Sequence, residues 1–193
     1  MKIFFKKIIA VGILFFPLMT FAGDWKIIPK ESSITFTATQ NNSPVLGKFT
    51  DFNGDIHFDP AQLKTSHVRI VVNMASVTTD YADIADTLKL ADWFDIKTYP
   101  QAIFTTSDFV KKGDKSYQAN GILTIRDKAI PVMMTFTLDE FTQNKAHAEG
   151  SVELKRLAFG VGQGEWKKTD NIKDEVKVNF VVNANASQQQ DHH

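Results

Sequence analysis

The segment 120–138 constrains the fold of this chain more than any other. Its apolar residues occupy alternate positions around Leu123, and again through Val132, Met134 and Phe136. Successive side chains of a β-strand point to opposite faces, so this alternation is typical of strands that bury one face. A buried helix would instead place apolar residues three and four positions apart. Because only a short polar segment separates the two runs, we predict an antiparallel hairpin.

The same alternation recurs along most of the chain. An all-β chain whose strands follow one another through short links favours an up-and-down meander, which must close or sandwich to hide its edges. Eight strands give a barrel that is either filled by its own side chains or able to hold one small ligand. We therefore predict an all-β, eight-stranded antiparallel up-and-down barrel. Its strands are expected at 33–39, 45–58, 68–74, 102–106, 117–125, 130–138, 146–154 and 176–184, after a short opening strand at 24–28.

Two stretches depart from simple alternation. Within 45–58 the apolar residues change from odd-numbered to even-numbered positions near Asp51. Either a β-bulge or a break into two strands would explain this change of parity. Within 79–94, Tyr81, Ile84 and Leu88 are three or four positions apart. We therefore predict one or two short helices there, between the fourth and fifth strands when the opening strand is counted.

The N-terminal segment has the features of a secretory signal. Lys2, Lys6 and Lys7 precede the apolar run 8–16, and the small residues Thr20 and Ala22 occupy the two positions that a signal peptidase reads. An uncleaved membrane anchor is the alternative, but the run is shorter than the ~20 residues that a span needs. We expect cleavage and export to the periplasm. The expected parts are a signal peptide at 1–22, a barrel domain at 23–186 and a disordered polar tail at 187–193.

Composition excludes several classes of function. The chain of 193 residues has no cysteine, so disulfides and thiolate metal sites are excluded. Without the first 22 residues, which hold three lysines and no acid, 19 basic and 22 acidic residues remain, a net charge of −3. This charge does not favour binding to a nucleic-acid backbone.

The inward positions of the predicted barrel are apolar and of mixed size. Large residues such as Phe104 alternate with small ones such as Ala119 and Gly121, and none of the inferred inward positions carries a charge. Large and small residues could mesh into a solid core. However, the run Ala146–Gly150 beside Ala119 and Gly121 could thin one wall. We favour a hollow lumen that accepts a long apolar molecule and offers no groups to transform it.

The motifs of several enzyme classes are missing from the sequence, among them the nucleophile elbow, the zinc-protease helix and the phosphate loop. The glycine-rich segment 160–164 superficially resembles a dinucleotide loop, but no helical pattern follows it, so we interpret it as a loop at the barrel mouth. Histidines and acids are expected on the surface or at helix ends. The sequence predicts no catalytic residue, no metal and no cofactor. The histidines and acids expected on the surface or at helix ends are His57, His67, His147, Asp80, Asp83, Asp86 and Asp92.

Short motifs occur from one end of the exported chain to the other. They are Trp25-x-Ile27, Ser33-Ile34-x-Phe36, Gly47-Lys48-Phe49, Phe52-Asn53-Gly54-Asp55-Ile56, Asp92-Trp93-Phe94-Asp95, Tyr99-Pro100-x-Ala102-x-Phe104, Gly121-x-Leu123-Thr124-Ile125 and Phe159-Gly160-Val161-Gly162-x-Gly164-x-Trp166. With these motifs the chain resembles the YceI-like family of secreted bacterial proteins. The resemblance spans nearly the whole exported chain and implies a lipocalin-like barrel in the periplasm that holds a polyisoprenoid or another long-chain amphiphile. An isoprenoid quinone is one such ligand, and a homodimer is a further implication.

The predicted ligand-contacting residues are apolar side chains of the inward face and of the two long excursions at 79–94 and 157–168. Two cations, Arg156 just before the second excursion and Lys167 within it, are candidates for contact with an anionic head group. A membrane-associated donor or acceptor would supply or receive the ligand. Two alternatives are an enzyme that modifies a lipid at the mouth and a solid structural barrel. The predicted contacts are Phe36, Phe49, Phe52, Phe58, Met74, Leu88, Trp93, Phe94, Phe104, Leu123, Met134, Phe136, Phe159, Trp166 and Phe180.

Overall fold

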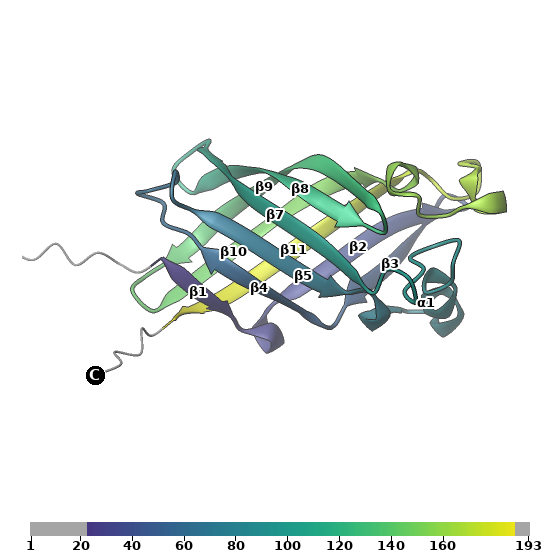
Figure 1. The fold of residues 1–193 in the computed structure, drawn as a ribbon, viewed down its shortest axis with the longest axis horizontal. Helices are drawn as coiled ribbons and strands as arrows, with labels where there is room; N and C mark the ends of the chain where they lie inside the picture. The colour runs from purple at the N-terminus through teal and green to yellow at the C-terminus, as the bar shows by residue number, and fades with distance from the viewer. Residues whose placement is uncertain (1–22, 188–193) are drawn as a thin grey trace, which may run out of the picture.

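The alternating segments become the strands of one closed antiparallel β-barrel in the computed structural model, which describes residues 23–187 (Figure 1). The predicted signal peptide and residues 188–193 of the predicted tail lie outside the described residues. In the described part, no helix has the length and apolar character to cross a membrane.

Eight strands form the closed ring, which confirms the predicted number. Their membership differs, because the opening strand at 24–27, which was not counted, closes the ring, while the predicted strand at 33–39 lies outside it. Strands β4, β5 and β7 to β11 pair in the order of the sequence, and the short β1 closes the ring by pairing with β4 on one side and β11 on the other. The links from β7 to β8, from β8 to β9 and from β9 to β10 are short, which favours the up-and-down order there. The ring strands are β1 (Asp24–Ile27), β4 (Phe52–His57), β5 (His67–Asn73), β7 (Gln101–Lys111), β8 (Ser116–Ile125), β9 (Lys128–Phe141), β10 (Lys145–Lys155) and β11 (Glu175–Ala186).

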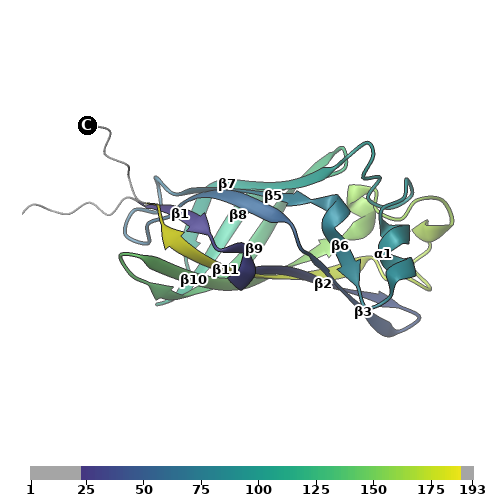
Figure 2. The same cartoon turned by 90° about the horizontal axis from the view of Figure 1, so that it is seen from below.

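Three further strands lengthen the barrel wall at one end: β2 (Ser33–Gln40), β3 (Ser43–Phe49) and β6 (Val77–Thr79) (Figure 2). The C-terminal part of β11 pairs with β1, and its preceding part pairs with β2, so β1 and β2 follow each other along the same neighbour. The parity change near Asp51 is a break between β3 and β4, since these strands pair with different partners. Ser76 holds the break, because its Oγ accepts the main-chain N–H groups of Thr50 and Asp51 at 3.2 and 3.1 Å.

The predicted hairpin is β8–β9, with Leu123 paired to Ile130. Its last pair is Ile125 with Lys128, so the connection is the two residues Arg126 and Asp127, shorter than the sequence indicated. Arg126 adopts a positive φ of 55°, as tight two-residue hairpin turns require.

One α-helix, α1 (Ala82–Leu88), forms within the predicted helical segment, and turns occupy most of residues 89–99. Short 3-10 helices complete the connections. Helix α1 and the β10–β11 connection lie at the same end of the barrel, opposite the end where the described chain begins and ends (Figure 1). The 3-10 helices are η1 (Pro29–Glu31), η2 (Met74–Ser76), η3 (Arg156–Phe159) and η4 (Gly164–Lys167).

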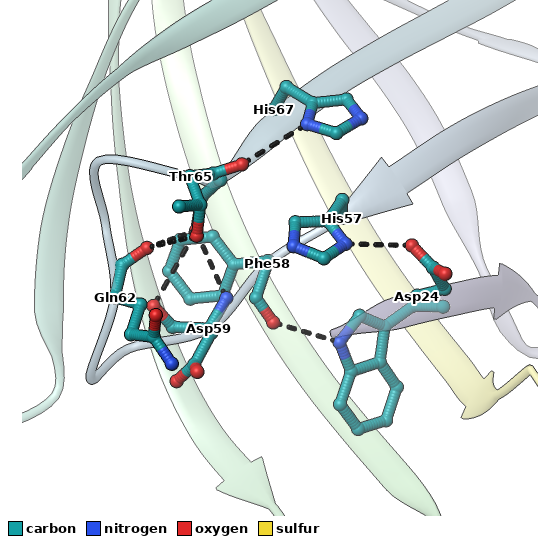
Figure 3. Close-up of polar contacts among 9 residues, drawn as sticks. Asp24, His57, Phe58, Asp59, Gln62, Thr65 and His67 are labelled. Atoms are coloured by element: carbon teal, nitrogen blue, oxygen red, sulfur yellow. Dashed lines mark hydrogen bonds and ion pairs between the residues drawn. The ribbon is translucent and has the colours of Figure 1, made fainter. Parts of the chain in front are cut away.

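Aromatic side chains fill the end of the barrel opposite α1. The Phe58 ring meets Tyr117 and Phe136 edge-on, with centroid separations of 5.6 and 5.9 Å. The indole N–H of Trp25 donates to the carbonyl oxygen of Phe58 at 3.0 Å, joining β1 to the start of the β4–β5 loop (Figure 3). Because edge-to-face aromatic pairs and a satisfied indole stabilise buried clusters, this end is a packed floor.

Candidate ligand cavity

A cavity of about 210 Å³ lies inside the barrel above the aromatic floor. Its wall uses inward side chains from every strand of the ring, and Thr106 is the one polar residue among them. The Thr106 hydroxyl donates to the carbonyl of Asn120 at 2.6 Å, so it is already satisfied. This deep cavity therefore presents a hydrocarbon surface to anything it contains.

A second cavity, of about 380 Å³, continues toward α1. It is bounded by the lengthened wall of β2 and β3, by α1 and by the β10–β11 connection. The two walls share several residues, so the two spaces adjoin along the barrel axis. The shared residues are Ile34, Val72, Ala102, Leu123, Leu154 and Val178.

Every apolar residue predicted to contact the ligand lies in one of these two walls. The contact itself stays a prediction, but the hollow interior favours the open lumen over the solid core. The deep wall includes Phe52, Phe58, Phe104, Met134, Phe136 and Phe180, the upper wall includes Phe36, Phe49, Met74, Leu88, Trp93, Phe94, Phe159 and Trp166, and Leu123 belongs to both.

Arg156 holds the β10–β11 connection in place from inside. Only 4% of the residue is exposed. Its guanidinium donates four hydrogen bonds to main-chain carbonyls: to Lys173, Val161 and Ile172 at 3.0 Å each, and to Trp166 at 2.8 Å. Since a guanidinium has five N–H donors, at most one is left for a ligand.

This placement leaves at most one donor of Arg156 for the predicted head-group contact, which stays a prediction. Burial lowers the pKa of Arg156 from its ordinary value, and the charge of Asp174 acts in the opposite direction. Lys167, the other predicted cation, is exposed and lies outside both walls. Sequence spacing could not reveal that Arg156 turns inward, because its partners are carbonyl groups that every residue possesses.

The glycine-rich segment serves the same connection. Gly162 has a φ of +84°, and a Cβ atom there would lie 2.1 Å from Nη1 of Arg156. The N–H groups of Gly162 and Gln163 donate to the carbonyl of Asp92 at 2.8 and 2.7 Å, which ties the connection to the turn after α1. The motif is therefore explained by backbone geometry and close approach to Arg156 rather than by a dinucleotide.

Trp93 and Trp166 pack together where these two segments meet, with ring centroids 5.5 Å apart. The guanidinium of Arg156 lies 5.7 Å from the Trp93 ring centroid, within the range of a cation–π contact. The indole nitrogen of Trp93 is buried and finds no acceptor among residues 23–187. The contact between the two segments is therefore held by packing of the rings and by the main-chain bonds to Asp92.

Polar residues enter the upper wall at Gln40, Asp83 and Thr87. Asp83 and Thr87 belong to α1, and Gln40 ends β2, where it bridges to Ile172. The Thr87 hydroxyl donates to the main-chain carbonyl of Asp83 at 2.8 Å. The sequence analysis placed Asp83 among the surface charges and did not identify Gln40 or Thr87 as site residues. The sequence of α1 does not indicate which side of the helix faces the barrel axis.

The three histidines within residues 23–187 lie outside the cavity walls, as their outward parity predicts. His57 bonds Asp24 through Nδ1 at 2.7 Å and stacks on His67, with centroids 5.1 Å apart (Figure 3). His147 bonds the side-chain oxygen of Asn183 at 2.8 Å. Across the described residues, no group of three or more histidines and acids is arranged to hold a metal ion.

A comparison with known protein families covers almost the whole described chain. The family model described as a YceI-like domain matches residues 25–184. The chain belongs to the YceI-like family. The resemblance read from the sequence is thereby confirmed.

Several known proteins are similar to this YceI-like chain in sequence or in structure. The crystal structure of BcnA from Burkholderia cenocepacia is similar with a TM-score of 0.78 and 33% identity, covering 81% of this chain and 98% of that one. A UPF0312 protein of Vibrio cholerae is 26% identical over 167 residues, which are 81% of this chain and 88% of the relative. A polyisoprenoid binding domain from Saccharophagus degradans, with a TM-score of 0.69 and 14% identity over 84% of this chain and 98% of that one, shows the same fold.

Proposed function

We propose that this YceI-like protein binds one long-chain apolar or amphiphilic molecule, such as a polyisoprenoid, an isoprenoid quinone or a fatty-acid-like lipid, along the barrel axis. The observation that carries the proposal is the pair of adjoining cavities of about 210 and 380 Å³ inside a closed barrel. The structural likeness to a domain described as polyisoprenoid binding supports it.

The apolar walls provide a sufficient driving force for a long chain but not for a short one. Each buried methylene contributes roughly 0.8 kcal/mol, so ten contribute about 8 kcal/mol. Association itself costs about 4–15 kcal/mol, so stable binding requires a chain that reaches through both cavities. We therefore expect affinity to rise with chain length until the ligand reaches the aromatic floor.

We place this binding in the periplasm, with the ligand supplied or received by a membrane-associated partner, for transport, storage or sequestration. The signal-like segment at 1–22 supports this location. Cell fractionation with N-terminal sequencing tests it: a periplasmic form that begins at Gly23 is expected, and a cytoplasmic form that retains Met1 would contradict it. Light scattering on the purified protein tests the predicted homodimer.

Extraction of the purified protein with organic solvent, followed by mass spectrometry, tests the binding function. We expect one long-chain lipid per chain. Ala102 belongs to both cavity walls and is 6% exposed, so Ala102→Phe places a ring where the cavities adjoin. Gln101→Phe is the matched control, because Gln101 is the exposed neighbour on β7 and lies outside both walls.

The variant pair separates lumen binding from surface binding. Ala102→Phe should lose most of the extracted lipid while remaining folded, and Gln101→Phe should retain it. Repeated recovery of no lipid from the unaltered protein, together with no binding of added long-chain lipids, would refute the proposal. Equal lipid content in both variants would show that the lipid binds outside the lumen.

A further inference from the structure

The combined cavity is polar at one end only. The deep cavity offers a single polar side chain, Thr106, whose hydroxyl is already bonded to a carbonyl. The upper wall has four polar or charged side chains: Gln40 at the end of β2, Asp83 and Thr87 on α1, and Arg156 on the β10–β11 connection. An amphiphile in this lumen should therefore place its chain toward the aromatic floor and its end group in the upper cavity.

The α1 side of this polar end carries a negative charge. Asp83 is the one acid in the upper wall, it is exposed, and within residues 23–187 its carboxylate forms no ion pair or side-chain hydrogen bond. The one cation in the same wall, Arg156, keeps its positive charge but directs four of its five donors to main-chain carbonyls, so at most one donor is left for an anionic end group. Asp80 and Asp86, on the same segment as Asp83, are also exposed.

We propose that Asp83 selects ligands by their end group, favouring an uncharged group that donates a hydrogen bond, such as a hydroxyl or an amide, over a phosphate or a carboxylate. The Asp83 carboxylate accepts the donated hydrogen, and the Gln40 amide and Thr87 oxygen offer further polar contacts. This inference rests on the proposed function, since it concerns the end group of a ligand held in the same lumen.

Electrostatics sets the size of the expected selection. Two unit charges about 4 Å apart in water repel enough to change an equilibrium constant about fivefold, and more where the site is partly shielded from solvent. At about 0.15 M salt the Debye length is ~8 Å, so exposed acids farther away contribute little. Neutralising Asp83 should therefore change the affinity for anionic ligands about fivefold or more, whereas neutralising a more distant acid should not.

Geranylgeraniol and geranylgeranyl phosphate form a suitable probe pair, because they share one chain and differ in the end group. Their affinities for the full exported chain would be measured by tryptophan fluorescence at about 0.15 M salt. We expect the alcohol to bind at least about fivefold tighter. Asp83→Asn should tighten the phosphate about fivefold and should not tighten the alcohol, since the asparagine oxygen accepts only the weaker hydrogen bond of a neutral group.

Two further variants complete the test. Asp80→Asn removes the same charge three positions earlier, at a residue outside the cavity walls, and should leave the alcohol-to-phosphate ratio unchanged. Asp83→Lys should reverse the preference. If both probes bind the unaltered protein but the phosphate binds as tightly as the alcohol or tighter, Asp83 does not select the end group and the inference is overturned. If neither probe binds, the proposed function itself fails.

Discussion

Replacing Arg156 with methionine tests whether this residue organises the cavity wall or meets a ligand. Methionine keeps much of the length of the side chain but has no N–H donor. The substitution therefore leaves the carbonyls of Lys173, Val161, Trp166 and Ile172 without the donor that now joins them. If Arg156 is the organiser, the protein should lose stability; if it is a head-group cation, the loss should be confined to binding.

The magnitude can be estimated from these contacts. Hydrogen bonds from a charged donor contribute about 1.5–3 kcal/mol each, so four give a gross contribution of about 6–12 kcal/mol. Part of this is recovered, because burying a guanidinium without a carboxylate partner is itself costly and because the freed carbonyls can bind water when the connection opens. We expect a net loss of about 3 kcal/mol, a large share of a typical unfolding free energy of about 5–15 kcal/mol.

Urea denaturation of Arg156→Met, Arg156→Lys and the unaltered protein measures this loss, and hydrogen exchange locates it. Arg156→Lys keeps the charge but not the planar fork of donors, so it should still lose about 2 kcal/mol. Lys167→Met, at an exposed position outside the walls, should change stability by less than about 0.5 kcal/mol. A loss below about 1 kcal/mol in Arg156→Met, with unchanged exchange protection in residues 160–172, would refute the organising role.

Three other features of the structure lead to measurable predictions. A Cβ atom at Gly47 would lie 2.2 Å from the Phe36 ring, so Gly47→Ala should push that ring into the upper cavity, cost about 1–3 kcal/mol and weaken binding of long chains; unchanged affinity would contradict this. The hydrogen bond from Lys155 lowers the pKa of Glu175, so its contribution to stability is present above the ordinary pKa of 4.5 and is lost as the pH falls through the lower pKa of the folded state. The urea midpoints of the unaltered protein and Glu175→Gln should therefore converge on acidification, and a constant difference would exclude this linkage. Burial raises the pKa of Tyr117 above its ordinary 10.0, so this residue stabilises the fold fully below pH 10.0 and loses that contribution as the pH rises through the raised value. The tyrosinate absorbance of Tyr117 is the difference between the unaltered protein and Tyr117→Phe. This difference should accordingly titrate with a midpoint above pH 10.0, and a midpoint below pH 10.0 would count against the buried environment.

The ring of strands could be predicted from the sequence because period-two alternation reports directly which face of a strand is buried. The hairpin of β8 and β9 and the closed up-and-down order were predicted and are confirmed. Strand ends and breaks were harder. Alternation near Asp51 changes in the same way for a bulge as for a break, and only the partners of β3 and β4 distinguish the two.

The cavity walls were predictable for the same reason, since an inward position on a strand is a wall position in a barrel. The polar features of the site were not predictable. The inward turn of Arg156 depends on carbonyl groups of a connection between strands, and the position of Asp83 depends on how α1 packs at the mouth. Both are set by tertiary contacts, which no spacing of residue types in the chain reports.

Phenylalanine rings that lie along the wall explain how a barrel rich in aromatic residues remains hollow. In three places a Cβ atom built on a glycine would meet, at 2.2–2.5 Å, a phenylalanine ring from the neighbouring strand. The pairs are Phe36 with Gly47, Phe104 with Gly121 and Phe180 with Gly150. A ring that covers a glycine adds apolar surface to the wall without crossing the axis. The sequence suggested instead that small residues on neighbouring strands thin one wall, but β9 separates β8, which holds Gly121, from β10, which holds Gly150. The glycines therefore keep the lumen open by giving the rings a place against the wall, and a methyl group at any of them should narrow the space that the ligand needs.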